Sequence, residues 1–177
     1  VTAEAKFRVL IEKNGAEVYQ RFEDEAGALL GSGQSAGDAA VLQRVVDAYP
    51  NSKAALAAAV SLVGIFKEKE AWGSEVKILR WLYPRAESGA KEGLTADMAT
   101  ADMALKRYAA ALAWSERGVR QFKDASWTDP VTKERMTFGE LRDKLRSVEP
   151  LLGEGGRPTL PGPLPGANIR KCMVFVA

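Results

Sequence analysis

The stretch Tyr49–Pro84 reads YPNSKAALAAAVSLVGIFKEKEAWGSEVKILRWLYP, and it opens and closes on the same Tyr-Pro pair. Proline cannot continue a helix, so each pair predicts a helix end. Ser52 is a good N-cap for a helix over 53–69, whose apolar stripe is Leu56, Ala59, Val60, Val63 and Phe66. After a polar turn near 69–71, a second helix is predicted, with an apolar side of Trp72, Val76, Leu79 and Tyr83.

The preceding segment predicts another pair of helices. Asn14 and Glu17 have the spacing of a capping box, which favours a helix over 14–30. Its apolar positions are Val18, Phe22, Ala26 and Leu29. The glycine-rich GSGQSAG at 31–37 predicts a flexible break, after which Asp38 caps a helix that Pro50 ends.

The following segment predicts a third pair, over AKEGLTADMATADMAL (90–105) and YAAALAWSERGVRQF (108–122). Beyond residue 123, WTDPVTKERMTF has a proline-containing turn between short β-prone pieces. Thr137 and Glu140 form a capping box for a last helix. Residues 150–167 contain five prolines and five glycines and predict an extended linker, and RKCMVFVA at the end predicts a short strand.

The amino-acid composition excludes several kinds of catalytic and metal site. The chain of 177 residues has no histidine, which removes the commonest general base and neutral metal ligand. Cys172 is the only cysteine, so an intrachain disulfide or a cysteine-rich zinc site is excluded. The formal net charge is +2 with both signs interspersed, which argues against nucleic-acid binding, and no apolar run suggests a membrane span. We therefore expect a non-enzymatic protein without cofactor or metal.

Pro50 and Pro84 lie 34 residues apart, which is the tetratricopeptide (TPR) period, and the interval holds two helices and a turn. The chain resembles TPR-like helical repeat proteins, and AYPNSKAA in particular is similar to those of bacterial cell envelopes. The resemblance places Tyr108 at the family's aromatic position and Ala99, Ala111 and Gly118 at its small-residue positions. It departs from the family at Val60, Trp72 and Leu79, where smaller residues are usual, so wider helix spacing is expected there.

The resemblance implies a fold and a role. The fold is all-α, a TPR-like α-α superhelix of about three helical hairpins with an extended Pro/Gly-rich C-terminal tail. The expected divisions are an N-terminal segment (1–13), the repeat domain (14–123), a turn with a final helix (124–149), and the linker with its terminal strand (150–177). The role is a protein–protein interaction or scaffolding module that binds a peptide or partner protein.

The family's groove positions give the candidate binding residues. They fall on Ala54, Ala57, Ser61, Gly64 and Ile65 in the central hairpin and on Ala96, Thr100 and Met103 in the next. Trp81 lies off the apolar stripe of its helix, so an exposed Trp81 beside Arg80 is a further candidate contact. The partner-binding set is Ala57, Ser61, Ile65, Arg80, Trp81, Thr100 and Met103.

Several alternatives stay open at this point. The region also resembles the helical part that precedes PQQ-binding-like β-propellers in envelope proteins. A thioredoxin-like enzyme domain beyond residue 177 would instead make it an accessory region of a redox protein. A periplasmic or envelope location is expected, with the cytoplasm as alternative. An internal spacer without a ligand in its groove is the alternative to partner binding.

Other charged and aromatic residues have ordinary explanations. Asp97 and Asp102 are expected to be solvated carboxylates rather than metal ligands, and the tryptophans other than Trp81 to pack in the core. The basic residues of the C-terminal part are expected on a solvated helix surface, with docking of an acidic partner or of nucleic acid as lesser possibilities. They are Lys133, Arg135, Arg142, Lys144 and Arg146.

Overall fold

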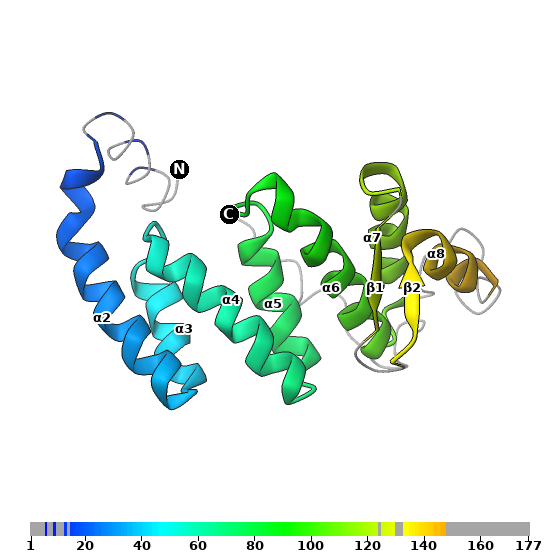
Figure 1. Cartoon of the computed structure of the whole chain (residues 1–177), viewed down its shortest axis with the longest axis horizontal. Coiled ribbons are helices and arrows are strands. Elements are labelled where there is room, and N and C mark those ends of the chain that lie inside the picture. Colours follow the sequence, from blue (N-terminus) through cyan, green and yellow to red (C-terminus); the bar gives the residue numbers. More distant parts are fainter. Residues whose placement is uncertain are drawn as a thin grey trace, which may run out of the picture.

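A computed structural model describes residues 15–123, 125–129 and 133–147, together with Lys6, Val9 and Lys13. This part of the chain is mostly helical, as the all-α prediction requires, and its helices stand side by side in one elongated row (Figure 1). In chain order the elements are η1 (Ala16–Tyr19), α2 (Gln20–Ala36), α3 (Ala39–Ala48), α4 (Lys53–Glu68), α5 (Trp72–Leu82), η2 (Ser88–Ala90), α6 (Lys91–Ala104), α7 (Tyr108–Gln121), β1 (Ser126–Thr128), β2 (Arg135–Thr137) and α8 (Phe138–Ser147). The predicted Asn14 cap, linker and terminal strand lie outside the described residues.

The prediction of a flexible break over 31–37 is wrong, because α2 continues as a helix to Ala36. Gly33 has a packing role there. A Cβ on it would come within 2.9 Å of the Leu42 side chain, so the missing side chain lets α2 and α3 approach closely. Gly37 ends α2 with a φ of 60°, a conformation that glycine adopts without strain. Asp38 then caps α3, accepting from the backbone of Ala40 at 2.8 Å.

Three helix pairs turn in the same way. One of the first two residues after each first helix has a positive φ: Gly37 (60°) directly after α2, and Glu70 (52°) and Lys106 (58°) two residues after α4 and α6. In each case the next backbone N–H reaches back to a carbonyl of the helix, as Asp38 does to Gly33, Ala71 to Phe66 and Arg107 to Asp102. These are Schellman-type helix ends. They make antiparallel hairpins of α2 with α3, α4 with α5, and α6 with α7, which Figure 1 shows in order along the row.

The two Tyr-Pro pairs lie where one hairpin joins the next, as the spacing predicts. α3 ends at Ala48 and α5 at Leu82, each shortly before its proline. Ser52 caps α4 through its hydroxyl, which accepts from Ala55 N at 2.9 Å and donates to Tyr49 O at 2.8 Å. Both joints are therefore fixed by local hydrogen bonds and by the inability of proline to extend a helix.

The predicted apolar stripe of α4 is partly wrong. Val60 is 60% exposed, so it cannot separate the helices as the comparison with the repeat family suggested. The fully buried positions of α4 are Ala55, Ala58, Ala59 and Leu62. Because alanines occupy so many positions of this helix, the face that packs is set by its neighbours rather than by one apolar row.

The C-terminal part is a small β-hairpin followed by a helix. β1 and β2 pair antiparallel, with Trp127 opposite Met136, which confirms the predicted β-prone pieces. The capping box of α8 is also confirmed, since Glu140 accepts from Thr137 N at 2.8 Å and donates its own backbone N–H to Thr137 Oγ1 at 3.2 Å. Phe138, the first residue of α8, is fully buried.

Buried residues form two groups. The larger group joins α2 to α5 and the start of α6, and the smaller one joins α6 and α7 to β2 and α8. Trp114 of α7 packs against both. None of the helices in the described part of the chain combines the length and apolar character that crossing a bilayer requires.

Candidate functional site

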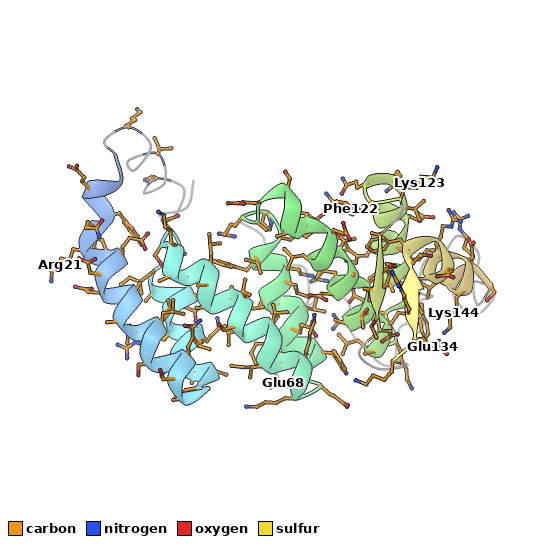
Figure 2. All side chains as sticks on the ribbon, in the orientation of Figure 1. Arg21, Glu68, Phe122, Lys123, Glu134 and Lys144 are labelled. Atoms are coloured by element: carbon orange, nitrogen blue, oxygen red, sulfur yellow. The ribbon has the colours of Figure 1, made fainter. Side chains whose placement is uncertain are left out.

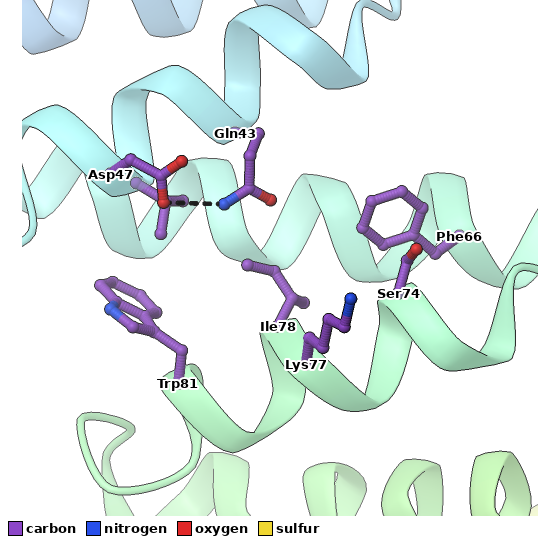
Figure 3. Close-up of a pocket in the computed structure, with 8 residues that line it drawn as sticks. Gln43, Asp47, Phe66, Ser74, Lys77, Ile78 and Trp81 are labelled. Atoms are coloured by element: carbon purple, nitrogen blue, oxygen red, sulfur yellow. Dashed lines mark hydrogen bonds between the residues drawn. The ribbon is translucent and has the colours of Figure 1, made fainter. Parts of the chain in front are cut away.

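A pocket of about 480 Å³ lies between α3 and α5, above the end of α4 (Figure 3). Two second helices of adjacent hairpins therefore form its walls. Its lining residues are Gln43, Val46, Asp47, Phe66, Ser74, Lys77, Ile78 and Trp81. Those from α5 share one helix face, because residues three, four and seven apart lie above one another.

The pocket combines aromatic, aliphatic and charged groups. The Phe66 and Trp81 rings lie at its two ends, with Ile78 between them (Figure 3). On α3, the Gln43 amide donates to Asp47 Oδ1 at 2.9 Å, which engages that carboxylate. Lys77 is exposed on the opposite wall and forms none of the ion pairs described for this structure. An apolar surface flanked by an ammonium group is suited to binding rather than to acid–base chemistry.

Trp81 is held in place by a neighbouring cation. The Arg85 guanidinium lies over the indole ring, 4.3 Å from its centroid, and also donates to the Trp81 backbone carbonyl at 2.7 Å. The indole is half-buried, so the expectation of an exposed Trp81 holds only for part of its surface. Arg80, its predicted companion, is exposed. Of the predicted partner-binding set, Trp81 alone lines the pocket.

The other predicted binding residues lie on the first helices of the hairpins. Ala57, Ser61, Ile65 and Met103 are half-buried. The Ser61 hydroxyl accepts from Gln34 of α2 at 2.9 Å, so it already joins two helices. The prediction of Thr100 as a contact is wrong, because this residue is only 5% exposed and packs inside. Ala54 and Ala96 are likewise buried, whereas Gly64 is exposed.

Asp97 and Asp102 are not solvated, contrary to the prediction. The Lys67 ammonium of α4 donates to Asp97 Oδ1 of α6 at 2.5 Å, and only 23% of the Asp97 side chain is exposed. Asp102 is fully buried, with Arg107 Nη1 3.7 Å from its Oδ1. Burial raises the pKa of both carboxyl groups, while Lys67 and Arg107 respectively oppose that rise. The two residues do face different sides of α6, as their spacing predicts.

Sequence reasoning missed one further acid, Glu75 of α5. It is 1% exposed, and neither of its carboxylate oxygens has a hydrogen-bond partner among the described residues. Burial is the main cause that raises the pKa of Glu75 to about 7. In the described part of the chain, no three Cys, Asp or Glu side chains gather into a group that could hold a metal ion.

The pocket residues other than Trp81 were also missed, because the family resemblance directs attention to the first helices. A signal was present in the sequence. Ser74, Lys77, Ile78 and Trp81 recur at helical spacing on α5, opposite the stripe of Val76 and Leu79. A comparison of the chain with protein-family models, with curated proteins and with solved structures finds no match among them.

Proposed function

We propose that this protein is a non-catalytic interaction module, a TPR-like superhelix that binds a peptide segment of a partner protein. The pocket between α3 and α5 is the observation that carries the proposal. It offers two aromatic rings and an aliphatic side chain next to the ammonium of Lys77, which forms no ion pair among the described residues. Aromatic residues that stay partly exposed in a pocket are typical anchors of protein interfaces.

The charges around the pocket favour an acidic segment. Arg44 of α3 and Arg80 of α5 are exposed on the helices that form the walls, but Arg80 also acts on Asp102 of α6, so Arg44 is the cation nearer to the pocket lining in sequence, next to Gln43. Among the described residues that line the pocket, the one carboxylate belongs to Asp47, and it already accepts a hydrogen bond from the Gln43 amide. We therefore expect a peptide that inserts one apolar or aromatic side chain and carries Asp or Glu beside it, since complementary charge steers and orients binding.

A peptide-display selection tests this proposal. The intact chain is the bait, and Trp81→Ala is the counter-selection bait, so that enriched sequences depend on the pocket. Enriched peptides should carry an aromatic or aliphatic residue beside acidic ones. Their dissociation constants, measured by calorimetry, should rise at least about 10-fold for Trp81→Ala, because anchor residues account for most of the binding energy.

Two charge variants make the result specific. Lys77→Glu should weaken binding. Lys144→Glu makes the same charge change at an exposed position of α8 (Figure 2) and should leave binding unchanged. Ser61→Arg tests the surface of the first helices. If binding is lost in Ser61→Arg and kept in Trp81→Ala, the pocket is not the site. If peptides are enriched only when the counter-selection is left out, the chain binds peptides but not through the pocket. If none is enriched by the intact chain even then, the interaction function itself is refuted.

A further inference from the structure

Glu75 lies on the buried side of α5, where α5 packs between α4 and α6. This residue is almost completely buried, and its two carboxylate oxygens lack hydrogen-bond partners among the described residues. A carboxyl group in such surroundings is strongly disfavoured in its charged form, because nothing replaces the water it has lost. An acid with no partner at the centre of a helical stack is a costly feature that calls for an explanation.

Two charged groups act on Glu75, one from each helix packed against α5. They are Lys67 of α4 and Asp97 of α6, and they form an ion pair with each other. Lys67 lowers the pKa of Glu75 and Asp97 raises it, while burial, the largest cause, places it at about 7. The Lys67–Asp97 pair also links the hairpin of α4 and α5 to that of α6 and α7.

The net charge of Glu75, Lys67 and Asp97 together depends on whether Glu75 carries its proton. With Glu75 neutral, Lys67 and Asp97 balance each other. With Glu75 ionised, two carboxylates share one ammonium, and the group carries an excess negative charge between three helices. The ionised Glu75 then repels Asp97 and attracts Lys67. Its ionisation therefore weakens the Lys67–Asp97 link between the hairpins, although Glu75 is not itself a member of that ion pair.

We propose that Glu75, together with the Lys67–Asp97 pair, forms a proton-sensitive joint at which the α6–α8 part packs tightly on α4 and α5 when Glu75 is protonated and loosens when it ionises. The joint does not depend on the proposed peptide binding. It would give the stack a stiffness that changes around neutral pH, through a carboxyl group rather than through histidine, which this chain lacks.

The sign of the effect follows from proton linkage. The pKa of Glu75 is higher in the folded chain than its ordinary value of 4.5. The folded state therefore binds more protons than the unfolded state between pH 4.5 and about 7, and its stability falls as the pH rises through that window. Above that window Glu75 adds no further pH dependence.

Carboxyl-detected NMR of the intact wild-type chain tests the titration directly. Comparison with Glu75→Gln assigns the Glu75 signal, whose midpoint should lie near 7. Thermal unfolding is followed alongside. The wild-type melting temperature should fall by roughly 5 to 10 °C from pH 5 to pH 8. In Glu75→Gln, whose amide resembles the neutral acid, most of that fall should vanish.

The matched control is Glu68→Gln, which removes an exposed carboxylate from the end of α4 and should keep the wild-type pH dependence (Figure 2). Amide hydrogen exchange locates the loosening. Corrected for intrinsic rates, exchange should accelerate between pH 6 and 8 in α6 and α7 of wild type but not of Glu75→Gln. A Glu75 midpoint between 4 and 5, or equal pH dependence in wild type and Glu75→Gln, would overturn the proposal. If Glu75→Gln does not fold, amide exchange of the wild type decides the proposal, since an exchange rate in α6 and α7 that stays constant between pH 6 and 8 would overturn it.

Discussion

Gly118 of α7 lies directly against the ring of Phe138, the first residue of α8. A Cβ placed on Gly118 would lie 2.2 Å from two ring carbons, closer than non-bonded carbon atoms can pack. The ring is itself fixed, because it is fully buried and contacts Trp127 with a centroid distance of 4.6 Å. The approach of α8 to α7 therefore requires a glycine at this position.

Gly118→Ala should destabilise the chain by about 2 kcal/mol or more, because neither the buried ring nor the helix backbone can yield without cost. Chemical denaturation measures the free energy of unfolding. Gly64→Ala is the control, since a Cβ at Gly64 meets nothing within 4 Å. It should stabilise by about 0.5 to 1 kcal/mol through helix propensity. Equal effects of the two substitutions would show that Gly118 is not needed for packing.

The hairpin turns predict a second, opposite pair of effects. Glu70 has a φ of 52°, which strains an ordinary side chain, so Glu70→Gly should stabilise the chain by about 1 kcal/mol. Gly37 occupies the equivalent position with a φ of 60°, and Gly37→Ala should destabilise by a similar amount. Unfolding midpoints in urea check both. If Glu70→Gly loses stability instead, the turn of α4 and α5 does not have the described geometry.

Lys67 holds Asp97 and also acts on Glu75, so its removal should affect both acids. Lys67→Met should lower stability at pH 8 by about 2 kcal/mol, because a half-buried ion pair is broken from one side. It should also raise the pKa of Glu75 above its value of about 7, since Lys67 lowers it. Denaturation at pH 5.5 and 8 and the carboxyl titration measure these effects. Lys69→Met, at an exposed residue of the adjacent turn, is the control.

The α8 capping box predicts a response to acid of the other sign. Hydrogen bonds from Thr137 lower the pKa of Glu140. The stabilisation it adds is present above the ordinary value of 4.5 and is lost as the pH falls through the lowered pKa. Thr137→Ala should cost about 1 kcal/mol at neutral pH. It should weaken the acid response without abolishing it, because the larger cause, the hydrogen bond from the Thr137 backbone N–H, remains. Helical circular dichroism during denaturation at pH 7 and pH 3 tests both. Unchanged stability at pH 7 would contradict the role of the cap.

Features set by local chemistry could be predicted from the sequence. Asp38, Ser52 and Thr137 cap the expected helices, since a cap depends on residues within one turn. Pro50 and Pro84 mark the joints for the same reason. These positions mark the starts of α3, α4 and α8 and the joints after α3 and α5, while the apolar periodicity supplies the remaining helices.

Features set by contacts between distant residues could not be predicted. Gly33 breaks no helix because Leu42 packs against it. Val60 faces solvent although it fits an apolar stripe, because the alanines around it allow several faces to pack. Glu75 is acidic and lies in the first turn of α5, a position that normally suits an exposed acid. Its burial arises from the packing of α5 with other helices, which a local sequence pattern does not show.

The two groups of buried residues that share Trp114 have a consequence for how the chain loses its structure. In a stack where each hairpin contacts only its neighbours, the smaller group has fewer contacts to hold it. Denaturation should therefore proceed in two steps, with β1, β2 and α8 lost first and the hairpins of α2 to α5 last. Trp114 contacts both groups, so the loss of either group should change the surroundings of its indole, and each step should alter the tryptophan fluorescence of the chain.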